Sequence, residues 1–167
     1  MIVRRTQEED IAKVLEVYQA GRQFQRQVLK LWQWEDHYPN EAQLREDISA
    51  AGSYMVLEEN SGQGSEILAT FFVQEGPDQI YLPLKSHWQD LDQIVTIHRL
   101  ASNGRQKGMG KFIFNWLQSQ FNYIMIDTHD HNHVMKKLLA DFNFRNIGQV
   151  TIANGTLRNV YEYQTDM

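Results

Sequence analysis

His98 and the loop at residues 105–111 carry the side chains best suited to chemistry in this sequence. His98 lies in the β-branched stretch QIVTIHRLA, and the loop combines one arginine, two lysines and two glycines. A neutral imidazole can take a proton from an ammonium group. Glycines let bare backbone amides approach a phosphate, and nearby cations add to the attraction. The sequence therefore predicts a candidate general base followed by an anion-binding loop.

The spacing of the loop excludes two common phosphate-binding patterns. A Walker P-loop needs glycine where Arg105 stands and Ser or Thr where Phe112 stands, and a dinucleotide fingerprint needs glycine at Ile113. Six consecutive residues instead resemble the R/Q-x-x-G-x-G/A signature of the GNAT superfamily of acyl-CoA N-acyltransferases. They are Arg105, Gln106, Lys107, Gly108, Met109 and Gly110. The alternative is a glycine-bearing strand-to-helix turn that binds nothing.

The second half of the chain extends the resemblance. The family pattern runs Asn, a small or apolar residue, Leu-Tyr and then Gly-Phe. The corresponding residues here are Asn132, Met135, Leu138, Leu139, Asn143 and Phe144. The resemblance covers about 2–163, and it is to a bacterial group with IHR-A before the loop and DTH before the asparagine. Leu139 departs from the pattern, because many members carry there a tyrosine that protonates the leaving thiolate.

The resemblance implies an acetyl-CoA-dependent N-acetyltransferase. Acetyl would pass to a primary amine of a small molecule or peptide by direct attack in a ternary complex. The chain has no cysteine, so an enzyme-bound thioester is excluded. The implied coenzyme contacts are Leu100, Ala101, Arg105, Gln106, Lys107, Gly108, Met109, Gly110, Lys111 and Asn132. Two alternatives remain: a catalytically weak or inactive coenzyme A-binding regulatory module, and a nucleotide-binding regulatory domain that uses the same loop.

The acceptor amine must lose a proton before it attacks, and His98 is the leading candidate base. Strand alternation predicts Ile94, Thr96, His98 and Leu100 on one face, which in the family looks toward the thioester. The alternative is a half-buried structural histidine. His129 is a second acid/base candidate. His129, His131 and His133 alternate, but this stretch spans a strand end and a helix start, so no metal site is expected.

An aromatic segment follows the first predicted helix. In the family this segment lies over the acceptor, so these rings are candidate walls of the substrate pocket. The candidate substrate residues are Arg22, Phe24, Trp32, Trp34 and Tyr38. The alternative is a loop that caps the core, with at least one tryptophan buried. The excess of acidic residues favours a cationic acceptor.

The elements in the first half follow from hydrophobic periodicity. MIVRR predicts a strand, and helical spacing follows a Thr6/Glu9 capping box toward residue 27. Asn40 is positioned to cap a second helix. Three strands are then predicted at YMVLEEN, EILATFFVQE and QIVTIHRLA, with a hairpin turn at SGQGS and a loop through the prolines at 77 and 83.

In the second half, a helix begins at Met109 with an apolar stripe at i, i+3 and i+4. YIMID predicts a strand, HNHVMKKLLADFNF a helix that Asn143 ends, and the last segment a hairpin around Asn154 and Gly155. The order indicates a mixed α/β sheet. The resemblance implies the α/β (α+β) GNAT fold, a mostly antiparallel sheet of about seven strands flanked by about four helices.

Length, charge and composition limit the classes of protein to which the chain can belong. The 167 residues suit a single domain, 1–167, with a core large enough to need no disulfides. Sixteen Lys and Arg stand against 21 Asp and Glu, and the net charge of −5 would repel nucleic acid. No apolar stretch is long enough to span a membrane, and the N-terminus lacks a signal core. We therefore expect a cytoplasmic protein, monomer or homodimer, with an amine substrate and no nucleic-acid or membrane partner.

Overall fold

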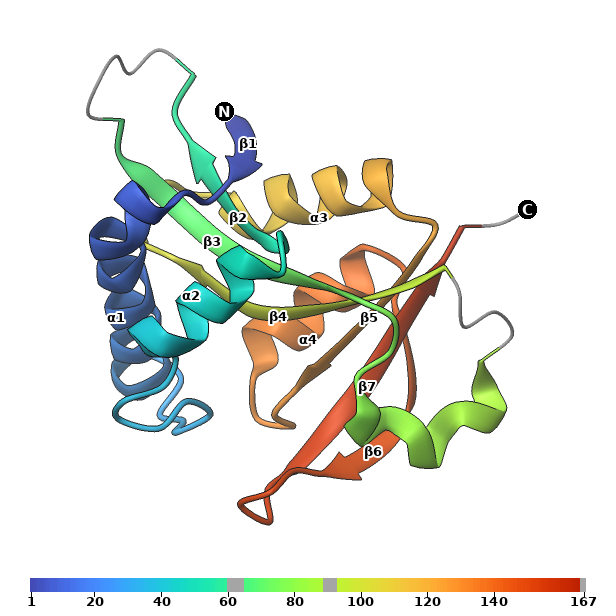
Figure 1. Cartoon of the computed structure of the whole chain (residues 1–167). Coiled ribbons are helices and arrows are strands. Elements are labelled where there is room, and N and C mark those ends of the chain that lie inside the picture. Colours follow the sequence, from blue (N-terminus) through green and yellow to red (C-terminus); the bar gives the residue numbers. More distant parts are fainter. Residues whose placement is uncertain (60–64, 89–92, 166–167) are drawn as a thin grey trace. The chain divides into compact units, whose positions relative to one another are not determined.

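The computed structural model describes residues 1–59, 65–88 and 93–165 (Figure 1). Its seven-stranded sheet has the order β1-β2-β3-β4-β5-β7-β6, and it is mixed and mostly antiparallel, as predicted. The chain divides into two compact units. Unit 1 is Met1–Val73 with His98–Met109, and unit 2 is Gln74–Ile97 with Gly110–Met167.

The first elements of the chain build unit 1. They are β1 (Ile2–Arg5), the 3-10 helix η1 (Glu8–Asp10), α1 (Ile11–Gln27), α2 (Glu41–Ser49), β2 (Ser53–Leu57) and β3 (Ile67–Glu75). β2 pairs antiparallel with both β1 and β3. Figure 1 shows α1 and α2 side by side, and they are in contact. The apolar side of α1 enters a core that contains Val14, Tyr18, Trp34, Leu44, Met55 and Ala101.

Later elements build most of unit 2. They are the 3-10 helix η2 (Gln79–His87), β4 (Ile94–Ser102), α3 (Met109–Gln120), β5 (Tyr123–Thr128), α4 (His133–Asp141), β6 (Arg145–Thr151) and β7 (Leu157–Gln164). β3 and β4 each have residues in both units. Residues 94–97 of β4 pair in parallel with 123–126 of β5, and β7 pairs antiparallel with both β5 and β6.

Local predictions at one helix start, one helix end and one hairpin turn are confirmed. Asn40 caps α2, because its side chain accepts a 2.9 Å hydrogen bond from the backbone N–H of Gln43. Asn143 has φ 60° just beyond α4, the left-handed conformation expected after a helix end. Gly155 has φ 81° in the turn between β6 and β7.

Two local predictions need correction. The capping interaction before α1 lies one residue later than predicted, because the Asp10 carboxylate accepts the backbone N–H of Gln7 at 2.8 Å. Thr6 is buried instead, and its hydroxyl accepts a hydrogen bond from Ser53. The loop through Pro83 contains η2, whose start is capped by Asp78. The turn predicted at SGQGS covers 61–65, of which 61–64 lie outside the described residues.

Within the part of the chain that the structure describes, no helix combines the length and the apolar character needed to span a membrane.

Candidate active site

The second half of β4 brings the candidate base His98 against an aromatic ring of β3. The half-buried His98 ring stacks on Phe72, with ring centroids 6.4 Å apart and planes 24° apart. The Arg99 guanidinium lies over the same ring, with Cζ 4.6 Å from its centroid. Arg99 has φ 51°, so the extended backbone is interrupted between His98 and Leu100. Simple alternation of side chains therefore does not continue through this part of β4.

Arg99 is held by a buried carboxylate of α2. Its Nε and Nη2 atoms donate to Oδ2 and Oδ1 of Asp47, each at 2.7 Å. The side chains of Arg99 and Asp47 are only 9% and 2% exposed. Burial raises the pKa of Asp47, while hydrogen bonds from Arg99 and Gln43 act in the opposite direction. This two-point geometry makes a strong, directional ion pair.

Sequence reasoning did not identify Arg99 and Asp47, although both leave a signal. Asp47 lies on the same helical stripe as Leu44 and Ile48, at i+3 from Leu44. Arg99 lies in a mostly apolar strand. A charge placed in each of two apolar surfaces indicates a buried pair, because either charge alone would be costly to bury.

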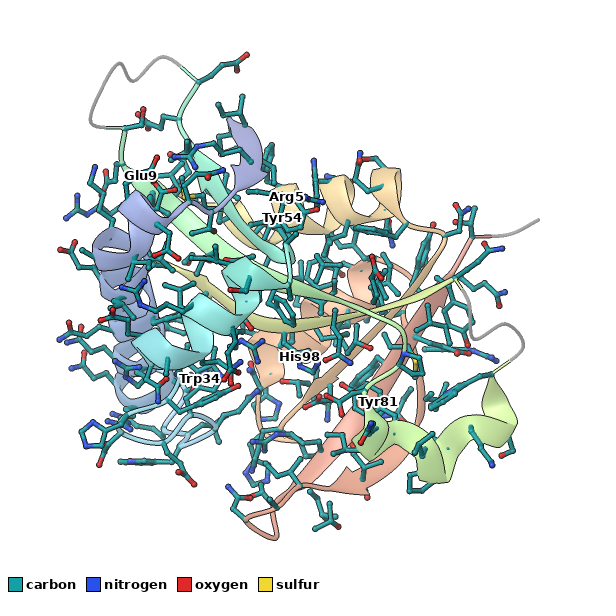
Figure 2. All side chains as sticks on the ribbon, viewed as in Figure 1. Arg5, Glu9, Trp34, Tyr54, Tyr81 and His98 are labelled. Atoms are coloured by element: carbon teal, nitrogen blue, oxygen red, sulfur yellow. The ribbon has the colours of Figure 1, made fainter. Side chains whose placement is uncertain are left out.

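Three predicted substrate residues lie in this region of unit 1: Arg22 of α1, and Trp34 and Tyr38 of the segment that follows α1. Tyr38 accepts a 3.1 Å hydrogen bond at its hydroxyl from Arg99 Nη1. Arg22 Nη1 donates to the carbonyl oxygens of Tyr38 and Pro39, each at 3.1 Å, so it braces this segment. Trp34 packs edge-on against Tyr18 and Tyr38 and is 8% exposed. It therefore belongs to the core, the alternative considered for one tryptophan. Figure 2 labels Trp34 near α1 and α2.

The other two predicted substrate residues are on the surface. Trp32 is 68% exposed, and the guanidinium of Arg26 lies 5.8 Å from its ring centroid. Phe24 is also exposed, on the last turns of α1. Their role at an acceptor site stays a prediction.

The predicted coenzyme loop begins with a hydrogen-bonded turn in unit 1. The Asn103 side chain donates to the Ile67 carbonyl at 3.1 Å and accepts the Arg105 N–H at 3.0 Å. Gly104 and Gly108 have φ 76° and 78°, and a Cβ atom at either position would meet nothing within 4 Å. Left-handed backbone with open space beside it is the arrangement in which glycine presents its amide to a ligand.

The loop cations lie on the surface. Arg105 is paired with Glu66, and it remains 74% exposed at its side chain. Gln106 and Lys107 are exposed as well. Met109 is buried at the start of α3, and Ala101 is buried against Gly21 of α1, whereas Leu100 is half-buried. The residues present thus fit a phosphate-bearing group at the loop, since it offers exposed cations and accessible backbone.

Unit 2 contains the remaining predicted coenzyme residues. Lys111 is exposed on the first turn of α3. Gly110 is packed against α4, because an added Cβ would lie 2.7 Å from Cδ2 of Leu138. Asn132 is buried and caps α4, its side chain accepting the Met135 N–H at 3.1 Å. Gly110 and Asn132 therefore each have a structural role, and their contact with the coenzyme stays a prediction.

His129 lies at the end of β5 in unit 2. Its Nδ1 accepts the backbone N–H of His131 at 3.1 Å. Burial lowers the pKa of His129, and the charges of Arg158 and His131 lower it further. A neutral His129 has its only ring lone pair in this hydrogen bond, so it could act as a base only after that bond breaks. Its catalytic role stays a prediction.

Two further observations concern chemistry at the site. The side chain of Leu139 is fully buried, so the position at which the family pattern has tyrosine belongs to the core of α4. Across the three described segments, no group of three or more His, Cys, Asp or Glu side chains is placed to hold a metal ion.

Comparison with known proteins identifies the fold. No family model matches the chain, and no curated protein matches it. A GNAT-family acetyltransferase from Streptococcus agalactiae is similar in structure, with a TM-score of 0.81 at 20% identity, over 99% of this chain and 96% of that one. The ribosomal-protein-S18-alanine N-acetyltransferase from Escherichia coli has a TM-score of 0.62 at 8% identity, over 99% and 94%. A chain of the NatC complex bound to Gag peptide and CoA has a TM-score of 0.64 at 13% identity, over 99% and 98%. The chain therefore has the fold of GNAT acetyltransferases.

Proposed function

We propose that this protein transfers an acetyl group from acetyl-CoA to a primary amine of a small molecule or peptide. The observation that carries the proposal is the GNAT fold over 99% of the chain, together with the R-Q-K-G-M-G loop that leads into α3. Among similar structures, the Escherichia coli enzyme is an N-acetyltransferase by name and NatC is bound to CoA and a peptide. Residues 1–167 would act as one domain, in the cytoplasm.

In the proposed reaction, the loop residues hold the coenzyme phosphates. Backbone amides around Gly108 and the cations Arg105, Lys107 and Lys111 supply complementary charge. His98 takes the proton from the acceptor ammonium. The free amine then forms a C–N bond to the acetyl carbon, and the C–S bond breaks. The acetylated nitrogen loses its second proton to become the amide, and the coenzyme leaves as a thiolate that takes up one proton.

The proton that the thiolate takes up comes from a group other than the side chain at position 139. Leucine carries no proton to donate, and Leu139 is fully buried. Loss of one general acid typically costs about 10²-fold to 10⁴-fold in rate, so turnover is compatible with its absence. The same observation supports the second candidate, a coenzyme A-binding module that has weak or no catalysis.

A thiol-release screen tests the proposal. Purified protein is incubated with acetyl-CoA and a panel of polyamines, aminoglycosides and peptides with free N-termini, while coenzyme binding is measured by calorimetry. We expect amine-dependent thiol release for at least one class. Coenzyme binding without release for any amine would establish the module instead, and displacement of the coenzyme by ATP would favour a nucleotide-binding domain.

The role of His98 is tested with a matched pair of variants. His98→Ala should lower kcat at least about tenfold and leave coenzyme affinity within about twofold, because the imidazole acts on the amine. His37→Ala removes an exposed histidine from the same unit and serves as the control. An unchanged kcat in His98→Ala at neutral pH would remove His98 from the mechanism.

A further inference from the structure

The ring of Phe72 contacts two consecutive residues of β4. His98 stacks on it, and the Arg99 guanidinium lies 4.6 Å from its centroid. In a regular strand, consecutive side chains point to opposite faces. Here Arg99 has φ 51°, a conformation that disfavours residues with a Cβ atom and persists only where the surroundings hold it.

What holds Arg99 is a set of directional contacts within unit 1. Asp47 accepts two hydrogen bonds at 2.7 Å from the guanidinium, and Tyr38 accepts a third at 3.1 Å. Within α2, the Asp47 carboxylate also accepts a 3.2 Å hydrogen bond from the Gln43 side chain. The contacts therefore connect the candidate base in β4 with α2 and with the segment after α1.

The pair is also part of the electrostatic surroundings of His98. The Asp47 carboxylate interacts electrostatically with His98 as well as with Arg99. The phenols of Tyr18 and Tyr38 also interact with the pair. Arg99 and Asp47 compensate each other, so His98 lies beside a pair with no net charge.

We propose that Arg99 and Asp47 are a positioning pair: together they set the place and the electrostatic surroundings of His98 and hold the Tyr38 segment at the acceptor side. The catalytic part of this inference rests on the proposed function, in which His98 is the base. The electrostatic part concerns His98 in the protein alone.

The variant Asp47→Asn removes the negative charge of the pair and leaves the positive one. In Asp47→Asn, the Arg99 cation is uncompensated next to His98 and opposes an imidazolium. Adding Arg99→Gln removes that cation. The electrostatic field at the His98 ring should therefore change in the single variant and return toward that of the wild type in the double variant.

NMR measures this without any substrate. The protein has six histidines, and the His98 ring signal is the one missing in His98→Gln. We expect the His98 ring signal, compared at one pH, to shift in Asp47→Asn and to return toward its wild-type position in Asp47→Asn/Arg99→Gln. Glu41→Gln, which removes a carboxylate from an exposed ion pair on the same helix, should leave the signal unchanged. A His98 signal unchanged in Asp47→Asn, or not restored in the double variant, overturns the proposal.

Arg99→Lys separates position from charge, and it keeps the test open if Asp47→Asn does not fold. Lysine retains the cation but not the two-point fork. We expect the KM for the acceptor amine to rise about tenfold and coenzyme affinity to stay within about twofold. Arg45→Lys, in the exposed pair with Glu41, is the control. An unchanged acceptor KM overturns the positioning role. If the wild type uses no amine at all, the proposed function is refuted, and the NMR result alone then decides whether the proposal for the pair holds.

Discussion

A Cβ atom added to Gly110 would lie 2.7 Å from Cδ2 of Leu138, so the second glycine of the loop signature is in contact with α4. The first, Gly108, has open space beside it and φ 78°. The two glycines therefore serve different purposes. Gly108 fits a ligand-facing position, whereas Gly110 allows α3 and α4 to pack closely.

A substitution at Gly110 should test packing directly. In the wild type, Gly110→Ala should destabilise the protein by about 1 kcal/mol, because overpacking outweighs the gain in helix propensity. In a Leu138→Ala background, the same change should stabilise by about 0.5–1 kcal/mol, because the obstructing methyl group is gone. Urea unfolding of the four proteins gives both values. The same sign in both backgrounds would show that Leu138 is not the constraint.

We expect the wild-type Glu66 carboxylate to weaken coenzyme binding, because it occupies Arg105. It pairs with Arg105, a predicted coenzyme contact, and both side chains are largely exposed. An exposed pair is worth about 0.2–1 kcal/mol, so Glu66→Gln should tighten coenzyme A binding by up to about fivefold. The gain should shrink at high salt.

Calorimetry at low and high salt checks this effect, with Glu41→Gln as a control for net charge. If both variants bind the coenzyme equally well, the Arg105 pair does not compete with the ligand.

The Asp10 carboxylate should stabilise the start of α1. It accepts hydrogen bonds from Arg4 at 2.8 and 3.0 Å and from the Gln7 N–H at 2.8 Å. Burial alone would raise its pKa, but these bonds outweigh burial and the pKa is lowered. Asp10→Asn should cost about 1–3 kcal/mol at pH 7.

The pH dependence of that cost follows from the lowered pKa. The contribution of Asp10 is present above the unfolded-state pKa of about 4 and is lost as the pH falls through the lower folded-state value. The difference between wild type and Asp10→Asn should therefore shrink in urea unfolding near pH 3. Asp36→Asn, which removes an exposed partner of Arg26, is the control and should change stability little at either pH. A gap that persists in acid would contradict the assignment.

His129 should make stability rise with pH. Its folded-state pKa is lowered, first by burial, so the unfolded chain binds a proton more readily. Stability should increase as the pH rises through the folded-state pKa toward the unfolded value of about 6.5. His129→Gln should flatten that part of the profile, measured by thermal unfolding between pH 5 and 8. His37→Gln, at an exposed position, should retain the wild-type slope.

Much of the fold was predictable because it depends on local patterns. The helical stripe of α1, the Asn40 cap and the left-handed Asn143 are properties of short segments, and each is confirmed. η2 was missed, because consecutive tight turns through Pro83 carry no apolar period of their own. The capping interaction before α1 was placed one residue early, since neighbouring polar residues offer equivalent donors and acceptors.

The candidate site also contains features that are local in sequence and features that join distant residues. The glycine-bearing loop and its cations are contiguous in sequence, so their resemblance to a family signature could be seen without the structure. The pairing of Arg99 with Asp47 joins residues 52 positions apart, and no local pattern specifies which buried charge meets which. Trp32 and Trp34 are two residues apart and similar in type, yet one is exposed and the other lies in the core.

The sequence by itself thus determined the order of strands and helices and the loop before α3, because backbone preferences and hydrophobic period act over a few residues. Only the tertiary structure decided the left-handed turn at Arg99, the ion pair with Asp47 and the packing of Gly110 on Leu138. These depend on burial and on contacts between distant segments, which arise only when the chain has folded.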